Sequence, residues 1–203
     1  MNKNIVFLTG FSGTGKTTVG RQVAKLLSWR FIDIDEEISF ELGQDISQVF
    51  ASQGEPTFRD LEHKKLLEVV ADDNLIISTG GGILTDERNQ TVMAKSGFTI
   101  CLEASIDTII NRLKQDVSSE IRPMLKGDLS VKSISKLKTY RQHLYSQADW
   151  TIHTDKLSEK TVASELIRAI HLINQSHDTE TVSYTHLRAH ETDSYLVCRL
   201  LLE

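Results

Sequence analysis

The chain has 203 residues, of which 39% are hydrophobic and 25% are charged, as is typical of one globular domain with a sizeable core. A formal net charge of −5 argues against nucleic acid as a partner, and no apolar run approaches the length of a membrane span. Two distant cysteines, Cys101 and Cys198, predict neither a disulfide framework nor a zinc site, so we expect a cytoplasmic protein.

The first predicted element is a strand near Asn4–Thr9, and the glycine-rich stretch Gly10–Thr17 follows it directly. This stretch matches the phosphate-loop pattern G-x-x-x-x-G-K-[ST], whose backbone N–H groups surround phosphates. Lys16 can reach the β- and γ-phosphates, and the Thr17 hydroxyl can bind Mg²⁺. A helix predicted at about Lys16–Ser28 adds its positive N-terminal end. We therefore expect a site for a nucleoside triphosphate.

Strands and helices continue to alternate along the chain. The later predicted strands are Arg30–Asp33, Leu75–Ser78, Phe98–Leu102 and Trp150–His153. The later predicted helices include Glu55–Ala71, Asp86–Lys95, Ile106–Lys114, Val131–Gln147 and Ser158–Ile173, with a further helix starting at Asp35-Glu36-Glu37. The polar stretch 115–129 is interpreted as a mobile loop. This alternation predicts an α/β fold with a parallel sheet covered by helices on both faces.

Two carboxylates, Asp33 and Asp35, follow the second predicted strand. If the strand continues through both residues, their side chains point to the same face. One carboxylate could then hold Mg²⁺ and the other could face an attacking hydroxyl. The alternative is that both acids only stabilise the start of the next helix. The nearby phosphate loop favours the functional interpretation. Because the strand Leu75–Ser78 ends without an acid, the metal role falls on Asp33.

The triple glycine Gly80–Gly82 follows another predicted strand, and its bare backbone could approach a small substrate closely. A flexible turn is the alternative interpretation. Three arginines, Arg59, Arg122 and Arg141, carry planar guanidinium groups that can bind a carboxylate with two hydrogen bonds, although a single arginine is more often a surface residue. Ligands of parallel sheets bind at the carboxyl ends of the strands, where the phosphate loop, the aspartates and the glycines should meet.

Together these residues resemble the shikimate kinase family over residues 1 to about 174. The resemblance rests on the order and spacing of Gly10–Thr17, Asp33–Asp35, Gly54–Glu62, Thr79–Gly82, Arg122–Leu125 and Tyr140-Arg141. It implies ATP-dependent phosphorylation of the 3-hydroxyl of shikimate. It also implies a three-layer P-loop fold of the nucleoside-monophosphate-kinase type, with a five-stranded parallel sheet and a mobile lid. We expect shikimate and ATP as partners, Mg²⁺ as cofactor, and a monomer.

The resemblance also implies a role for individual residues. The implied ATP-binding residues are Gly13, Thr14, Gly15, Lys16, Thr17, Thr18, Arg112 and Arg122. The implied shikimate-binding residues are Asp35, Arg59, Gly80, Gly81, Gly82 and Arg141. Thr17 and Asp33 are the implied metal ligands. The implied catalytic residues are Lys16, Asp35 and Arg122, of which Arg122 belongs to a lid that closes over ATP.

Two other functions stay open: a different small-molecule kinase, such as a gluconate kinase, and a nucleotide-binding module without catalysis. Arg59, Arg141 and the triple glycine favour shikimate over gluconate. An inactive module would be expected to lose Lys16, Asp35 or Arg122, and all three are present. We predict a kinase domain over residues 1–175 and a C-terminal appendage over 176–203, with an additional packed helix as the alternative for this segment.

Overall fold

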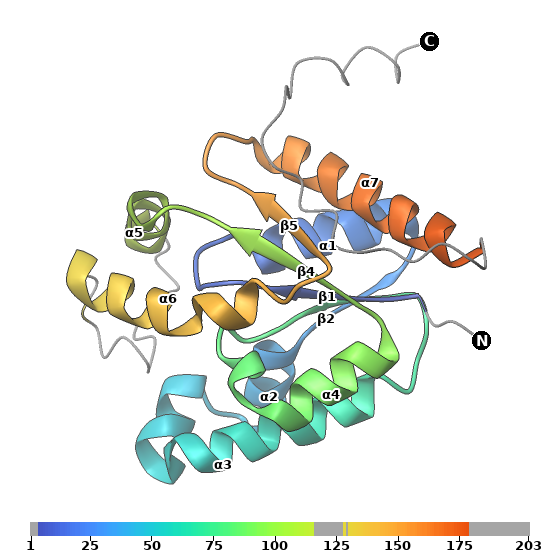
Figure 1. The fold of residues 1–203 in the computed structure, drawn as a ribbon. Helices are drawn as coiled ribbons and strands as arrows, with labels where there is room; N and C mark the ends of the chain where they lie inside the picture. Colours follow the sequence, from blue (N-terminus) through green and yellow to red (C-terminus); the bar gives the residue numbers. More distant parts are fainter. Residues whose placement is uncertain (1–3, 116–127, 129, 179–203) are drawn as a thin grey trace.

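The computed structural model describes residues 4–115, 128 and 130–178. Five strands form one parallel sheet in the order β2-β3-β1-β4-β5 (Figure 1). The strands are β1 (Ile5–Thr9), β2 (Arg30–Asp33), β3 (Leu75–Ser78), β4 (Phe98–Glu103) and β5 (Trp150–His153). The helices are α1 (Lys16–Leu27), α2 (Ile34–Leu42), α3 (Ile46–Val69), the 3-10 helix η1 (Ile83–Thr85), α4 (Glu87–Ser96), α5 (Ile106–Gln115), α6 (Val131–Tyr145) and α7 (Glu159–Asp178). The predicted fold class is confirmed.

The sheet has a separate hydrophobic cluster on each face. Side chains of a strand alternate between the faces, so Ile5 and Phe7 of β1 join one cluster, and Val6 and Leu8 join the other. The first cluster includes side chains of α2 to α6, and the second includes those of α1 and α7. Figure 1 shows α1 and α7 on one side of the sheet and α2, α3 and α4 on the other. The result is the predicted arrangement of three layers.

The second strand does not continue through both aspartates, as the functional interpretation of the pair had assumed. β2 stops at Asp33, and α2 begins at the next residue, so Asp35 lies in the first helical turn. The Asp33 Oδ1 atom accepts hydrogen bonds from the backbone N–H groups of Asp35 and Glu36, at 3.1 and 3.4 Å. Asp33 is therefore the N-cap of α2, and the helix begins at the next residue. The two carboxylates are therefore not neighbours on one strand face.

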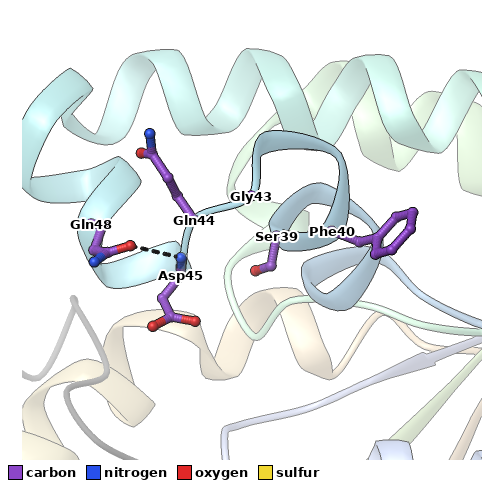
Figure 2. Close-up of a pocket in the computed structure, with 6 residues that line it drawn as sticks. All are labelled: Ser39, Phe40, Gly43, Gln44, Asp45 and Gln48. Carbon is purple, nitrogen blue, oxygen red and sulfur yellow. Dashed lines mark hydrogen bonds between the residues drawn. The ribbon is translucent and has the colours of Figure 1, made fainter.

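The third helix starts earlier than predicted. α3 begins at Ile46, not near Glu55, and it contains a kink at the non-helical residue Gly54. The Gln48 side chain accepts a hydrogen bond of 3.1 Å from the Asp45 backbone N–H, which Figure 2 marks as a dashed line. This contact is half of a capping box and stabilises the first turn. The segment before the kink is the part that the sequence interpretation missed.

The end of the described chain bears on the predicted domain boundary. α7 continues to Asp178 and so passes residue 175. Residues 179–203 lie outside the described residues, so the appendage stays a prediction. The predicted mobile loop also falls mostly outside them, at 116–127 and 129. Within the described part of the chain, no helix is both long and apolar enough to cross a membrane.

Candidate active site

The phosphate loop lies between the end of β1 and the start of α1, as predicted. The Lys16 ammonium is buried over the loop, where its Nζ atom donates to the carbonyl oxygens of Gly10 and Phe11 at 2.9 and 3.0 Å. The Thr14 hydroxyl closes the turn by donating to the same Phe11 oxygen at 2.9 Å, whereas Thr18 is exposed on α1. The positive charge of Lys16 is therefore held within the loop, next to any phosphate that enters it.

The two predicted metal ligands are in direct contact. The Thr17 hydroxyl donates to the Asp33 Oδ2 atom at 2.7 Å, and the Ser78 hydroxyl lies 3.4 Å from the Thr17 hydroxyl. Asp33 thus caps α2 with one oxygen and presents the other to Thr17. Such hard oxygen atoms suit Mg²⁺, which is commonly held by one or two protein ligands together with substrate phosphates and water. The pair fits the predicted role.

The triple glycine forms one wall of a cluster of charged side chains. A Cβ atom added to Gly80 would lie 2.5 Å from Glu62 Oε1 and 2.9 Å from Asp35 Oδ1. A Cβ atom on Gly82 would collide with the guanidinium group of Arg59. Glycine is therefore required here because the charged groups approach the bare backbone, which favours the interpretation as a binding surface over that as a flexible turn.

Arg141 faces the middle residue of the same wall. Its Nη1 atom would lie 3.5 Å from a Cβ atom on Gly81, and the residue is only 4% exposed. The Tyr145 hydroxyl donates to the Gly81 carbonyl at 2.6 Å. Burial raises the pKa of Tyr145 to about 12 although the charge of Arg141 opposes this, so the hydroxyl keeps its proton. Among the described residues, the buried Nε atom of Arg141 has no hydrogen-bond partner.

Arg59 is held by two carboxylates of its own helix. It donates to Glu55 Oε1 at 2.9 Å through Nη2, and its Nη1 atom pairs with Glu62 Oε2. Burial alone would lower the pKa of Arg59, but the charge and hydrogen bond of Glu62 raise it. The fork geometry leaves a fixed cation beside the glycine wall.

Glu62 is the most buried charged group of the cluster, with an exposed fraction of 0%. Burial raises its pKa to about 7, the charge of Asp35 also raises it, and the charges of Arg59 and Arg141 oppose the rise. Its Oε1 atom has no hydrogen-bond partner among the described residues. The two arginines, Asp35 and Glu62 thus form one electrostatic unit.

Arg112 contacts the phosphate loop from α5. Its Nη1 atom donates to the Gly13 carbonyl at 3.3 Å and to the Thr154 hydroxyl at 2.9 Å. Its Nη2 atom donates to the Thr154 carbonyl at 2.8 Å. This position supports the loop backbone and is compatible with the predicted place near ATP. Arg122 lies outside the described residues.

Sequence reasoning gave no role to three side chains of this site. Glu62 lies three residues after Arg59, and Tyr145 lies four residues after Arg141, so helical spacing alone places each on the same face as a predicted arginine. Thr154 follows β5, and the rule that ligand sites lie at the carboxyl ends of strands would have indicated it.

A separate hollow of about 340 Å³ lies between the end of α2 and the start of α3. Figure 2 shows its lining residues, Ser39, Phe40, Gly43, Gln44, Asp45 and Gln48. It contains none of the predicted site residues. The chemistry therefore points to the charged cluster and not to this hollow.

Comparisons with known proteins agree with the geometry. The family model described as Shikimate kinase matches residues 12–171. The chain is 40% identical to a shikimate kinase of Thermodesulfovibrio yellowstonii over 166 residues, covering 82% of this chain and 94% of the relative. It is also 40% identical to a shikimate kinase of Caldicellulosiruptor saccharolyticus, covering 86% and 98%. The structure of the Acinetobacter baumannii shikimate kinase in complex with shikimate has a TM-score of 0.77 and 31% identity, covering 84% of this chain and 94% of that one.

Proposed function

The chain belongs to the shikimate kinase family, and from this membership we propose that it transfers the γ-phosphoryl group of ATP to the 3-hydroxyl of shikimate. The main support for this proposal is that a phosphate loop lies next to the backbone of Gly80–Gly82, here called the glycine wall. This wall faces Asp35, Arg59 and Arg141. The first element suits ATP, and the second suits a small, anionic molecule that carries hydroxyl groups.

The acceptor half of the site suits a carboxylate and hydroxyls separately. The half-buried Arg59 and the buried Arg141 face the glycine wall, and their guanidinium groups bind a substrate carboxylate in our proposal. Asp35 borders the same wall and accepts hydrogen bonds from the substrate hydroxyls. The bare backbone of Gly80, Gly81 and Gly82 gives the ring room to lie between these groups.

The transfer step follows from this placement. The oxygen of the acceptor hydroxyl forms a bond to the γ-phosphorus, the bond from that phosphorus to the bridging oxygen breaks, and ADP leaves. Asp35 accepts the proton of the hydroxyl. Lys16 neutralises charge on the phosphates, and Arg122, which lies outside the described residues, is proposed to add a second positive charge. Mg²⁺ held by Thr17 and Asp33 supplies further charge neutralisation when bound.

The proposal also includes a role for Arg112, the cellular compartment and the oligomeric state. Arg112 borders the nucleotide site beside the loop residues Gly13 and Thr14. Cys101 is a free, buried thiol, in keeping with a reducing cytoplasm. We also propose that the enzyme is a monomer.

The test is a coupled assay of ADP release with Mg-ATP and either shikimate or gluconate. Shikimate-dependent turnover, with little turnover of gluconate, is the expected result. Preferential turnover of gluconate would assign the chain to another small-molecule kinase. No turnover of either acceptor, with ATP still bound, would indicate a nucleotide-binding module without catalysis.

A further inference from the structure

The glycine wall works only if its backbone is fixed relative to the charged side chains. At its start, the backbone N–H and the hydroxyl of Thr79 both donate to the Leu8 carbonyl of β1, at 3.1 and 3.0 Å. At its end the chain enters η1, where the Ile83 N–H donates to the Gly80 carbonyl at 3.1 Å. The start of the wall is thus tied to the sheet, and the position of its end depends on η1.

Side chains of α4 hold η1 in place. The Asn89 Nδ2 atom donates to the Ile83 carbonyl at 3.2 Å, and the Gln90 Nε2 atom donates to the Leu84 carbonyl at 2.7 Å. Asn89 is 0% exposed, so water cannot replace its bond if the side chain is removed. The Asn89 amide is therefore a buried anchor for the exit of the glycine wall.

The same amide links this anchor to α3. The Asn89 Oδ1 atom lies 2.8 Å from Nδ1 of the half-buried His63. An amide oxygen only accepts, so the proton of this hydrogen bond comes from His63. His63 follows Glu62 directly and lies one helical turn after Arg59. A continuous hydrogen-bonded route thus connects the helix that carries these two side chains with the wall that they face.

A second link between α3 and α4 lies on the surface and provides a comparison. The Arg88 Nη2 atom donates to Asp60 Oδ1 at 2.8 Å, with side chains that are 52% and 70% exposed. Exposed pairs of this kind contribute little, because water and salt screen them. The two links join the same helices, at the adjacent residues Arg88 and Asn89 of α4 and one turn apart on α3, but they differ in burial and in their connection to η1.

We propose that Asn89 is a positioning residue for the acceptor substrate and that His63 acts through it. The amide sets the distance between the glycine wall and Arg59, and so the fit of the acceptor. The described residues that we propose to bind ATP lie on the phosphate loop, α1 and α5, and none of them belongs to the wall, α3 or α4. Loss of the link therefore weakens acceptor binding selectively. The inference rests on the proposed function, because the acceptor is taken to be shikimate.

The experiment measures KM for shikimate, KM for ATP and kcat in the full chain. We compare Asn89→Leu and His63→Leu with His63→Asn, whose amide nitrogen replaces the Nδ1 donor, and with Asp60→Asn, which removes the negative charge from the exposed ion pair. The two leucine variants are expected to raise KM for shikimate about three- to tenfold, the equivalent of one hydrogen bond. KM for ATP should stay within about twofold. His63→Asn should restore the wild-type KM, and Asp60→Asn should leave it unchanged.

A double variant separates one shared route from two independent contacts. Asn89→Leu combined with His63→Leu should raise KM for shikimate no further than Asn89→Leu alone. Unchanged KM for shikimate in both leucine variants, or an equal rise in both KM values, would overturn the proposal while wild-type turnover of shikimate upholds the function. If Asn89→Leu does not fold, the His63→Leu and His63→Asn pair decides the proposal. Failure of the wild type to use shikimate would instead refute the proposed function.

Discussion

Asp35 and Glu62 approach the same glycine but differ in their surroundings. Both carboxyl groups lie beside the position of a Cβ atom on Gly80. Asp35 is half-buried at the first turn of α2, whereas Glu62 is fully buried and has a pKa near 7. Neighbouring carboxyls in different environments commonly take different roles. In our proposal Asp35 handles the substrate proton, and Glu62 fixes Arg59.

Replacement of Asp35 by Asn tests the first of these roles. The amide keeps the shape of the side chain but cannot take a proton, so kcat should fall about 10²- to 10⁴-fold. The dissociation constant for ATP, measured by calorimetry, should change little. The control is Glu36→Gln, which alters the next residue, an exposed side chain paired with Arg21 at the surface. Near-normal turnover of Asp35→Asn would contradict the role of proton acceptor.

Glu62→Gln tests the buried carboxyl through the pH dependence of stability. The folded-state pKa of about 7 lies above the ordinary value of 4.5, so the folded protein keeps a proton that the unfolded chain loses in this range. The stability contributed by Glu62 is therefore full below pH 4.5 and is lost as the pH rises to about 7. Relative to Glu62→Gln, the wild type should lose up to about 3 kcal/mol of unfolding free energy across this window.

Urea unfolding of the wild type and Glu62→Gln at pH 4.5 and 7.5 measures this difference directly. Other titrating groups contribute nearly equally to both proteins, so they cancel in the comparison. A difference in unfolding free energy that stays constant between the two pH values would show that Glu62 does not titrate in this range.

At the scale of elements, hydrophobic patterns predicted the sheet well and the polar connections less well. All five strands were predicted close to their observed bounds. The reason is clearest for the central strands β1 and β3, which are buried throughout and are nearly continuous apolar runs. The first part of α3, from Ile46 to Gly54, was missed. Gly54 has non-helical backbone angles, and the chain accommodates it and the nearby Pro56 by kinking and then continuing as a helix.

The candidate site was predicted in the same uneven way. The phosphate loop has a sequence signature, so Lys16, Thr17 and their surroundings could be predicted without the structure. The Asn89 contact has no such signature, because its partners Ile83 and His63 are brought to it by the packing of α3, η1 and α4. Hydrogen bonds between separate elements depend on tertiary geometry that spacing in the sequence does not contain.

Gly97, which lies outside the site, provides a test of how closely the elements pack. Gly97 joins α4 to β4, and a Cβ atom there would collide with the Ile5 carbonyl of β1. The obstacle is backbone, which a rotamer change cannot remove. Gly97→Ala should therefore lower the free energy of unfolding by about 3 kcal/mol. In Gly43→Ala, the control, a Cβ atom meets nothing within 4 Å, and only its φ of 61° opposes alanine, at a cost of about 1 kcal/mol. If urea unfolding shows that both variants lose the same free energy of unfolding, the proposed collision at Gly97 is wrong.

At the scale of the whole molecule, the two proposed substrate sites use different parts of the chain. In our proposal, the ATP side is built by β1, α1 and α5, and the acceptor side by α2, α3, the glycine wall and α6. The two halves meet through β1 and β3, which are paired in the centre of the sheet. Variants of the acceptor side should therefore change shikimate kinetics with little effect on ATP binding.

The last prediction concerns how much of the chain this assembly needs. α7 packs on the sheet and α1 through Leu166, Ala169 and Ile170, which are fully or almost fully buried, whereas residues 171–175 are exposed or half-buried. The contribution of α7 to the core thus declines before the helix ends at Asp178. A chain that stops after Asp178 should keep its kcat and melt within about 2 °C of the full chain, corresponding to less than about 1 kcal/mol.

A shorter chain that stops after Arg168 is the matched control. It removes the buried Ala169 and Ile170 and the partly buried Ile173. The free energy of unfolding should therefore fall by about 2 kcal/mol or more, which corresponds to a fall in Tm of about 4–8 °C. If truncation after Asp178 lowers Tm as much as this control does, residues 179–203 contribute to the folded domain, and the prediction of an appendage is wrong. If only the shorter chain is destabilised, the kinase fold is complete at the end of α7.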